Sequence, residues 1–376
     1  MSDRDSTPER DPPPRLRIAS FNVSMEAQNY TDSELSLSPD ILKRHLASGD
    51  HPQIRNIAEI IQRVRPDILL LNEFDYIQPQ RQGIDQFQQQ YLGRSQSGQK
   101  TIHYPHVYLA PVNTGELMPV DVDGDGTISH PDDTYGYGHF PGQYAMVVLS
   151  RYPINIPRAR TFQMFKWRDM PAALIPTEPD GTPYYSPEVW SLFRLSSKSH
   201  WDLPIEVGKQ TLHLLASHPT PPVFDGPEDR NGRRNHDEIR LWVDYIAGEA
   251  DYLYDDRGIR GGLDSSARFV VVGDLNASPV EGNSRPEAIN ALLQHPRVTP
   301  VEPKSLGGAK QRPDNRHAPS HTASWGQRAD YVLPSSNLTI LDSGIFWPPK
   351  DHPLAYLVED RESSSDHRLV WVDVAL

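Results

Sequence analysis

The stretch that most constrains the fold is residues 67–75, DILLLNEFD, in which four apolar residues follow one another without a break. A strand with one face in water alternates apolar and polar residues, whereas a run that is apolar throughout is typical of a strand covered on both faces. A stretch with apolar residues at helical spacing, 52–64, comes directly before it, and Pro66 separates the two. The chain therefore needs a layered fold, with sheet inside and helices outside.

Six other stretches predict strands, and residues 235–250 predict a second helix. The predicted strands are 15–23, 144–154, 210–221, 267–279, 328–336 and 368–376. This order of elements predicts two packed sheets with helices outside them. Residues 77–143 and 155–207 show no regular period, and loops of this length are usually functional or poorly ordered. We interpret residues 1–14 as a disordered leader and 15–376 as one domain that carries these two insertions.

The composition narrows the classes of function. A net charge of −13 disfavours binding to nucleic-acid backbone by broad electrostatics, although a metal-dependent nuclease can offset acidic charge with its bound cation. The chain has no cysteine, which excludes disulfides and thiolate chemistry. No run of 18 apolar residues predicts a membrane span, and no apolar signal segment is visible at the N-terminus. The compartment stays open between export and cytoplasm, and we expect a monomer.

Nearly all the predicted strands have carboxylate, amide or imidazole side chains at one end. These residues are Asn22, Glu73, His218, Asp274, Asn276, Asp330, Asp366 and His367. One such ending is an ordinary turn, but so many predict side chains that converge on one edge of the sandwich. Hard oxygen ligands with Asn and His suit Mg²⁺, Mn²⁺ or Ca²⁺, and a metal held in this way suits the transfer of a phosphoryl group to water.

The motifs SFN, NEFD, SH, GDLNASP, ADYV and SSDH, in this order, resemble those of the endonuclease/exonuclease/phosphatase superfamily. The resemblance covers residues from about 15 to 376. It implies an α/β fold, a four-layered α/β sandwich of two packed mixed β-sheets flanked by helices, with long inserted loops. It also implies hydrolysis of phosphoester bonds that depends on a divalent metal, Mg²⁺ or Mn²⁺ with Ca²⁺ as a further option.

Carried over motif by motif, the resemblance implies a role for each residue at the strand ends. Glu73 would be the principal metal ligand, with Asn22 and Asp366 beside it. Asp274 would orient or deprotonate the attacking water, and Asn276 would hold a phosphate oxygen. These five residues would therefore bind the metal, the water and the phosphate.

Two histidines complete the implied site. His367 would donate to the scissile phosphate, with its ring fixed by Asp330, because a carboxylate behind an imidazole sets its tautomer and favours its charged form. His218 would support charge in the transition state or protonate the leaving group. The deoxyribonuclease and sphingomyelinase branches have a histidine there and the abasic-site branch lacks it, so His218 favours the former.

The first insertion contains the sequence DVDGDGTISHPDD, residues 121–133, which has the spacing of an EF-hand-type calcium loop. Its predicted ligands for a structural Ca²⁺ are Asp121, Asp123, Asp125, Thr127 and, at the twelfth position, Asp132. The twelfth position lacks the usual Glu, and apolar helical flanks are not evident. The alternative is an acidic turn, for which Asp-Gly repeats are common.

Two further groups could contact substrate. His139, Gln143 and Tyr144 lie in a Gly-rich segment before a predicted strand and either face the phosphate or serve packing. Arg233 and Arg234 form a basic spot in an acidic chain, and either bind an anion or pair with neighbouring acidic residues.

These observations favour an enzyme that hydrolyses a small or medium phosphodiester or phosphomonoester. A DNA or RNA endonuclease is the first alternative, and nucleic acid is an open but less favoured partner. A lipid-headgroup hydrolase also stays open, although no amphipathic basic helix predicts a membrane anchor. A non-catalytic binding module stabilised by calcium is the alternative from a different class.

Overall fold

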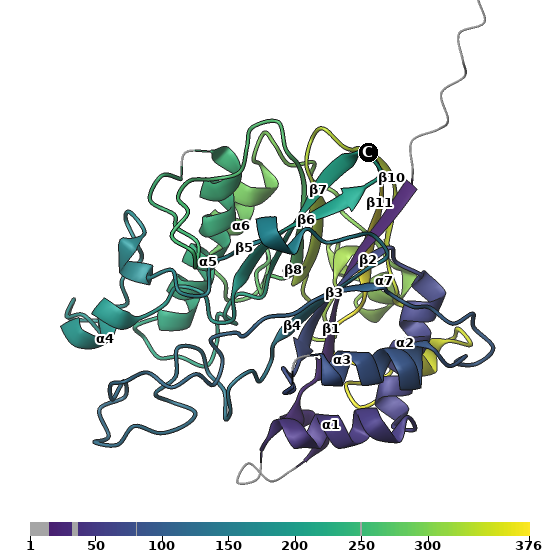
Figure 1. Cartoon of the computed structure of the whole chain (residues 1–376), viewed down its shortest axis with the longest axis horizontal. Helices are drawn as coiled ribbons and strands as arrows, with labels where there is room; N and C mark the ends of the chain where they lie inside the picture. The colour runs from purple at the N-terminus through teal and green to yellow at the C-terminus, as the bar shows by residue number, and fades with distance from the viewer. Residues whose placement is uncertain (1–14, 32–36, 80, 249) are drawn as a thin grey trace, which may run out of the picture.

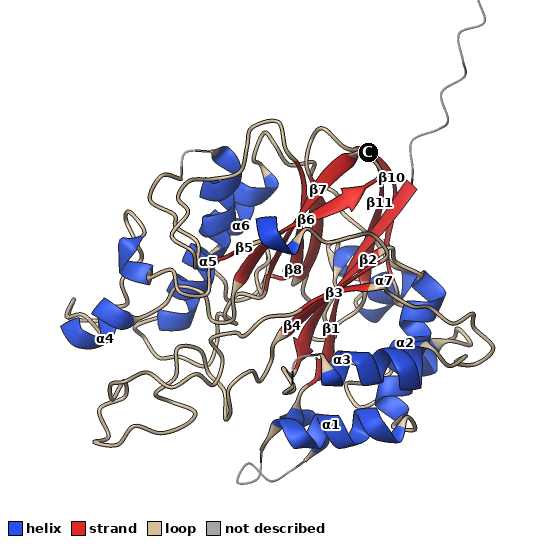
Figure 2. Ribbon diagram, in the orientation of Figure 1, coloured by secondary structure: helices blue, strands red, loops and turns tan. Residues whose placement is uncertain are grey.

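A computed structural model of the chain describes residues 15–31, 37–79, 81–248 and 250–376. The predicted leader, residues 1–14, lies outside this range. Two mixed β-sheets pack face to face, and helices cover the outer face of each (Figures 1 and 2). This arrangement confirms the predicted four-layered α/β sandwich.

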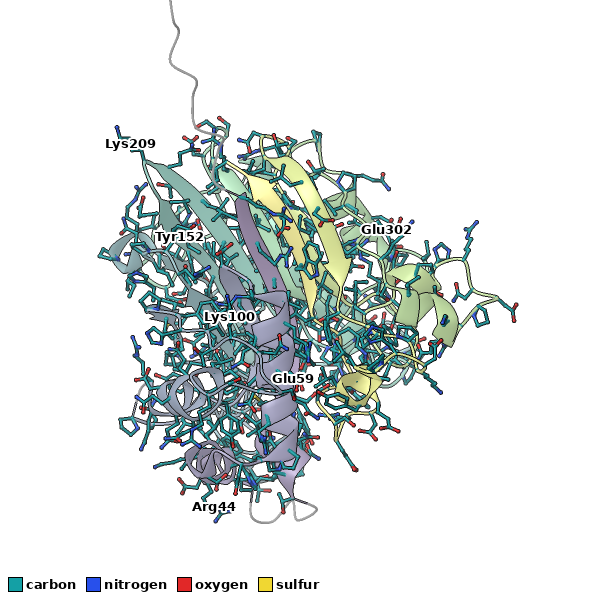
Figure 3. All side chains as sticks on the ribbon, turned by 90° about the vertical axis from the view of Figure 1, so that its right-hand side faces the viewer. Arg44, Glu59, Lys100, Tyr152, Lys209 and Glu302 are labelled. Carbon is teal, nitrogen blue, oxygen red and sulfur yellow. The ribbon has the colours of Figure 1, made fainter. Side chains whose placement is uncertain are left out.

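The first sheet has six strands in the order β10-β11-β1-β2-β4-β3. Their bounds are β1 Arg15–Met25, β2 Ile68–Phe74, β3 His106–Tyr108, β4 Met146–Ser150, β10 Thr339–Ile345 and β11 Val370–Ala375. β1 and β2 run parallel, and all the other pairs in this sheet are antiparallel. Its outer face is covered by α1 Pro39–Ser48, α2 Pro52–Val64 and α3 Gln82–Phe87. Figure 3 shows α2 lying along the strands.

The predicted core pattern of β2 and α2 is confirmed. The four residues from Ile68 to Leu71 are all fully buried, so both faces of β2 are covered. α2 has the predicted bounds, and its Ile54, Ile57 and Ile61 are buried in the same apolar cluster as β2. Burial of a full isoleucine side chain contributes about 1.5–3 kcal/mol, so this one helix face adds substantially to the stability of the layer.

The second sheet has five strands in the order β5-β6-β7-β8-β9. Their bounds are β5 Arg160–Thr161, β6 His200–Val207, β7 Gln210–Ser217, β8 Arg268–Asp274 and β9 Asp330–Pro334. β7 and β8 are parallel and the other pairs antiparallel. The helices α5 Arg230–Ala247 and α6 Pro286–Leu293 cover the outer face, where Ile239 and Trp242 belong to one apolar cluster with Phe269.

The remaining elements are short. They are α4 Pro187–Leu192, α7 Leu306–Gln311, a π turn at Gln88–Leu92, and 3-10 turns at Ala27–Tyr30, Ile156–Arg158, Trp167–Asp169, Ala318–Ser320 and Ala355–Val358. Within the described part of the chain, no helix is long and apolar enough to cross a bilayer.

Two strands, the short β5 and the longer β6, lie inside the segment 155–207, for which the sequence showed no regular period. The central Pro204 of β6 argues against a strand, because proline cannot donate to the hydrogen-bond ladder. In the structure the carbonyl of Pro204 accepts from Asn155 on the side away from β7, and β5 pairs only with Trp201 and Asp202. The missing N–H therefore faces the incompletely paired side of β6, where its loss is tolerated.

Strand direction gathers the polar strand ends at one edge. β1 and β2 finish at the same edge because they are parallel, and β11 starts there because it is antiparallel to β1. In the other sheet β7 and β8 finish together, and the antiparallel β9 begins beside them. The two edges meet, since Asn22 of β1 donates to Asp274 of β8.

Candidate active site

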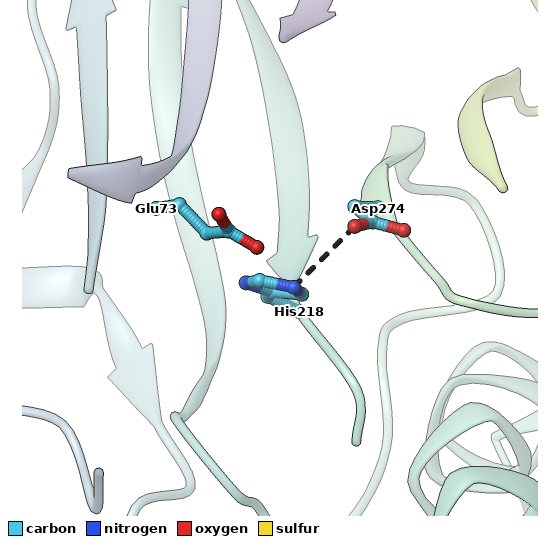
Figure 4. Close-up of side chains that lie close together, drawn as sticks. All are labelled: Glu73, His218 and Asp274. Carbon is cyan, nitrogen blue, oxygen red and sulfur yellow. Dashed lines mark ion pairs between the residues drawn. The ribbon is translucent and has the colours of Figure 1, made fainter. Parts of the chain in front are cut away.

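Three side chains from three different strands meet at this common edge. Glu73, His218 and Asp274 each offer a ligand atom, and these atoms lie within 4.8 Å of one another (Figure 4). Asp274, Asp330 and His367 form a second group of the same kind. Asp274 belongs to both groups and is their centre.

Asp274 is held as a buried carboxylate. Its Oδ2 accepts from the Asn22 amide at 3.1 Å and lies 3.4 Å from His218 Nε2 and 3.5 Å from His367 Nε2. Burial alone would raise the pKa of Asp274, but the charge of His367 and the hydrogen bond from His218 hold that pKa well below its usual range. The residue before Asp274, Gly273, must be a glycine, because a Cβ at this position would lie 2.0 Å from the carbonyl oxygen of Ser217.

His367 is paired with a carboxylate behind its ring. Its Nδ1 lies 2.8 Å from Asp330 Oδ2, which also accepts from the hydroxyl of Thr322 at 2.7 Å. Burial favours the neutral ring, but the carboxylates of Asp330 and Asp274 outweigh it and raise the pKa of His367 to about 10. The predicted Asp330–His367 pair is therefore present, and it leaves a charged Nε2 facing Asp274.

His218, in contrast to His367, is neutral. Burial, reinforced by the nearby ammonium of Lys198, lowers the pKa of His218, although Asp274 acts against this. Its Nε2 faces Asp274, and its buried Nδ1 has no hydrogen-bond partner in the structure. The site thus combines one neutral and one charged imidazole on the two sides of a single carboxylate.

The buried Asn22 and the partly exposed Glu73 belong to the same cluster. The Asn22 amide donates to Glu73 Oε1 at 2.9 Å as well as to Asp274, so it bridges the two carboxylates. Glu73 has a φ of 55°, in the left-handed region that non-glycine residues rarely adopt. Such a backbone conformation costs about 1–3 kcal/mol and is retained where the surroundings impose it, often at functional sites.

Asp366 shares a neighbour with Glu73, the guanidinium of Arg361. Its Oδ1 accepts from the Ser24 hydroxyl at 3.1 Å, and its side chain is 25% exposed. Two residues that sequence reasoning missed lie in the same place, namely Glu26 and Arg361. The Arg361 guanidinium lies within 4 Å of the carboxylates of Glu26, Glu73 and Asp366.

Glu26 is a buried acid at the end of β1. Burial, with a contribution from the charge of Glu73, raises the pKa of Glu26 to about 7. The sequence signals for Glu26 and Arg361 were their positions, four residues after Asn22 and five residues before Asp366. Neither residue belongs to one of the matched motifs, because Glu26 follows the strand end at Asn22 and Arg361 precedes the SSDH motif.

A profile of the Endonuclease/Exonuclease/phosphatase family matches residues 19–367, nearly the whole chain. The chain belongs to this family. Its members are metal-dependent phosphoesterases and nucleases, and they act as hydrolases that use divalent metals. A sequence search of curated proteins finds no match.

Several solved structures are similar to this chain at low sequence identity. One from Beutenbergia cavernae is 17% identical with a TM-score of 0.52, over 96% of this chain and 72% of that chain. The human Nocturnin catalytic domain with bound sulfate is 13% identical (TM-score 0.47; 96% and 95% covered). Sphingomyelinase C from Streptomyces griseocarneus is 14% identical (TM-score 0.45; 96% and 99% covered). The first of these likenesses shows the common fold.

The strand-end residues of this family member fit a divalent cation. Glu73 and Asp274 supply carboxylate oxygens, and the imidazole of His218 lies beside them with an unpartnered Nδ1. The chain has no thiolate that would favour a softer metal. Carboxylates surrounded by amide and imidazole groups are the donors expected for Mg²⁺ or Mn²⁺.

Asn276 lies beside Asp274 as predicted, in a left-handed conformation with φ of 50°. Its backbone N–H donates to Asp274 Oδ1 at 3.0 Å, and its side-chain amide donates to the carbonyl of Pro219 at 3.1 Å. The latter bond ties the turn after β8 to the turn after β7.

The Gly-rich segment before β4 reaches the edge of the cluster. Gln143 is fully buried, donates to Glu26 at 3.2 Å and accepts from the backbone N–H of His139 at 2.8 Å. Tyr144 donates from its backbone to the buried Asp75 at 3.0 Å. Gln143 therefore helps to hold Glu26 in place, and the backbone of His139 in turn helps to hold Gln143.

Arg233 and Arg234 are not brought to the cluster. Arg234 is 6% exposed and donates to the carbonyls of Leu195, Tyr135 and Arg194. Arg233 donates to the carbonyls of Glu228 and Ile175. Neither predicted alternative, an anion site or ion pairs with acidic neighbours, describes these contacts, because the two guanidinium groups tie α5 to the surrounding backbone.

The acidic loop holds a third group, separate from the strand ends. Asp121, Asp123 and Asp133 have ligand atoms within 4.8 Å of one another. The predicted ligand at the twelfth position, Asp132, is instead exposed, and the buried Asp133 takes its place. The carboxylate of Asp133 is held beside Asp121 and Asp123 because it accepts hydrogen bonds from the backbone N–H groups of Val122 and Ser129.

The other predicted loop ligands remain outside the group of three. Asp125 accepts from both the backbone N–H and the hydroxyl of Thr127, each at 2.7 Å. These bonds form a local turn, the arrangement expected of Asp followed two residues later by Thr.

Proposed function

We propose that this family member is a divalent-metal-dependent phosphoesterase that hydrolyses a small or medium phosphodiester or phosphomonoester. The observation that carries the proposal is the position of the Asp274 carboxylate, which lies close to the neutral imidazole of His218 and to the charged imidazole of His367. Asn22 and Glu73 lie beside these groups. A carboxylate in the charged form, next to a cationic donor, suits the activation of water at a phosphorus atom.

The residues divide the work as follows. Asp274 orients the attacking water and accepts its proton, and the water oxygen forms the new bond to phosphorus while the ester oxygen departs. The charged His367 donates from Nε2 to a non-bridging phosphate oxygen, and Asp330 fixes its ring through Nδ1. His218 stabilises the charge on the departing oxygen, and it would protonate that oxygen only after taking up a proton from solvent, because its lowered pKa leaves the ring neutral. A divalent ion would be held by Glu73, with Asn22 and Asp366 beside it, and when bound it would supply positive charge that stabilises the phosphate.

The charge distribution supports a substrate smaller than duplex DNA. The net charge is −13, and the arginine pair 233–234 is used for backbone contacts rather than for phosphates. Proteins that bind duplex DNA neutralise several phosphates with Lys and Arg. The endonuclease alternative rests on His218, and a steep fall of activity with added salt would favour it.

The first test uses metal-stripped protein to which Mn²⁺, Mg²⁺ or Ca²⁺ is returned. Turnover of bis(p-nitrophenyl) phosphate, p-nitrophenyl phosphate and supercoiled plasmid is compared, with Asp274→Asn as the control. We expect rapid hydrolysis of a small ester and an intact plasmid. A nicked plasmid with little turnover of the small esters would replace the proposal with the endonuclease. No turnover of any substrate with any metal would favour the non-catalytic module.

A second part of the proposal concerns the loop 121–133. A structural Ca²⁺ would be held by Asp121, Asp123 and Asp133, whose ligand atoms lie within reach of one ion. The loop's Asp-Gly spacing supports this assignment over an acidic turn, and thermal unfolding with and without Ca²⁺ tests it.

A further inference from the structure

The guanidinium of Arg361 lies among three carboxylates from three separate segments. One terminal nitrogen is 3.4 Å from Glu26 Oε1 and 3.8 Å from Glu73 Oε2, and the other is 3.6 Å from Asp366 Oδ2. Bonds between Arg and a carboxylate are about 2.7–2.9 Å long when the two are well paired. Arg361 is therefore shared among three partners and tightly paired with none of these three.

The backbone that carries Arg361 is fixed, whereas its side chain is accessible. Ser363 donates its backbone N–H to Asp360, and the carbonyls of Ser363 and Ser364 accept from Asn56 and Gln53 of α2. The side chain of Arg361 is 44% exposed, although that of its partner Glu26 is only 2% exposed. The guanidinium can therefore turn toward solvent while its loop and the carboxylates stay in place.

The carboxylates around Arg361 include the two that the proposed function assigns to the metal. Glu73 and Asp366 each lie within 4 Å of the guanidinium. Two cations compete when they need the same carboxylate oxygens, because each repels the other at short distance. A divalent ion at Glu73 and Asp366 would thus weaken the hold of these carboxylates on Arg361. The freed guanidinium would lie beside the site where a phosphate binds.

We infer that Arg361 is a substrate-binding residue that rests on Glu26, Glu73 and Asp366 in the metal-free protein and binds a phosphate oxygen once a divalent ion has displaced it. The inference rests on the proposed function and adds a residue to it. The planar guanidinium suits this role because it can donate two parallel hydrogen bonds to a phosphate. To move, it must leave three long ion pairs and break two hydrogen bonds, from Nε to the side-chain oxygen of Asn29 and from a terminal nitrogen to Glu26.

The test compares Arg361→Gln with a matched control, Arg151→Gln. Arg151 is 49% exposed and pairs with Asp67, just before the start of β2, far along the strand from Glu73. Calorimetry on metal-stripped protein measures Mn²⁺ affinity. We expect Arg361→Gln to bind Mn²⁺ at least about 5-fold more tightly, the lower range of coupling between two ligands, and the control to bind it as the wild type does.

The second measurement is the affinity of inorganic phosphate for the Mn²⁺-loaded protein. We expect Arg361→Gln to bind phosphate about 10-fold more weakly, the loss typical of one charge-assisted hydrogen bond. Arg361→Lys keeps the charge and should retain the Mn²⁺ affinity of the wild type with weaker phosphate binding. This variant also decides the matter if the Gln variant fails to fold.

Unchanged or weaker Mn²⁺ binding in Arg361→Gln would contradict the proposed competition between Arg361 and the metal for the same carboxylates. Unchanged phosphate binding would contradict the proposed contact between Arg361 and the substrate. Both readouts are binding measurements and need no turnover. A wild-type protein that hydrolyses no phosphoester would therefore contradict the proposed function separately, without being mistaken for a failure of this inference.

Discussion

The strand-end cluster and the loop 121–133 both bring carboxylates together, but they do so by different means. At the strand ends the groups come from residues 22 to 367, are largely buried, and are held by other side chains. In the loop, Asp121 and Asp125 accept from backbone N–H groups within five residues, and all three hydrogen bonds are exposed. A long-range cluster can tune charge states through burial, whereas a local loop mainly fixes its own shape.

The largest effect that separates the two regions is expected for Asp274→Asn. The change keeps the shape of the side chain but removes the charge that orients and deprotonates water, so turnover should fall by about three orders of magnitude. Asp121→Asn is the control in the loop and should leave turnover unchanged. Steady-state kinetics on the best small ester checks both, with circular dichroism to confirm folding. Equal rates in the wild type and Asp274→Asn would contradict the assigned role.

A smaller effect should appear in the pH profile of Asp330→Asn. The raised pKa of His367, about 10, depends chiefly on the Asp330 carboxylate. Because that pKa is raised, the stability from the charged ring is fully present below about 6.5, its unfolded value, and is lost as the pH rises through the folded value. Without Asp330 the ring loses its proton at lower pH. The alkaline limb of kcat should therefore move down by at least about one pH unit.

That pH experiment has a clear contrary outcome. An alkaline limb at the same pH in Asp330→Asn and the wild type would mean that another group, and not His367, controls activity at high pH. Thermal unfolding provides a second readout, since the stability that Asp330→Asn loses should shrink as the pH rises through the range in which His367 loses its proton, and also at low pH, because the pKa of Asp330 is raised by burial to about 6.

The loop offers a matched pair of neighbouring aspartates. Ca²⁺ should raise the unfolding temperature of the wild type by about 2–4 °C, as expected for roughly 1 kcal/mol of binding to the folded state. Asp123→Ala and Asp133→Asn should lose this response, whereas Asp132→Asn should keep it because Asp132 lies outside the group of three. A calcium response that depends on Asp132 rather than Asp133 would show that Asp132, the twelfth residue of the loop, is the ligand.

The last comparison uses two threonines that each donate to an aspartate. Thr322 is buried, and its hydroxyl donates to Asp330 and accepts from the backbone N–H groups of Ala329 and Asp330. Thr322→Val should lower the free energy of unfolding by about 1–3 kcal/mol, because it leaves buried donors without an acceptor. Thr127→Val, in the exposed loop, should not measurably change stability. Urea unfolding checks both, and equal losses would contradict the contrast between the regions.

Much of the fold was predictable because apolar pattern and strand direction act locally. The uninterrupted apolar run of β2 and the helical spacing of α2 predicted the core elements, and both are confirmed. The polar residues that lie beside them at strand ends predicted a shared edge, since the ends of neighbouring strands meet. β6 was missed because Pro204 argues against a strand unless its pairing partners are known.

Contacts between distant segments explain the other misses. The carboxylate of Asp133 replaces that of Asp132 only because the loop turns it toward the backbone N–H groups of Val122 and Ser129. Arg234 was predicted to bind an anion or to pair with acidic neighbours, but α5 packs it against carbonyls of the insertion 155–207. Arg361 is far from Glu73 in the sequence, and only the fold brings its loop beside that residue.

By itself, the sequence determined the residue types and their order along the strands, and these were enough to indicate the family and the chemistry of the site. The charge states were decided by the tertiary structure alone. His218 and His367 are the same amino acid at the same edge, yet burial lowers the pKa of one and a pair of carboxylates raises the pKa of the other. The reason is physical, because a pKa depends on the charges and the solvent around a group, and folding brings these together from distant parts of the chain.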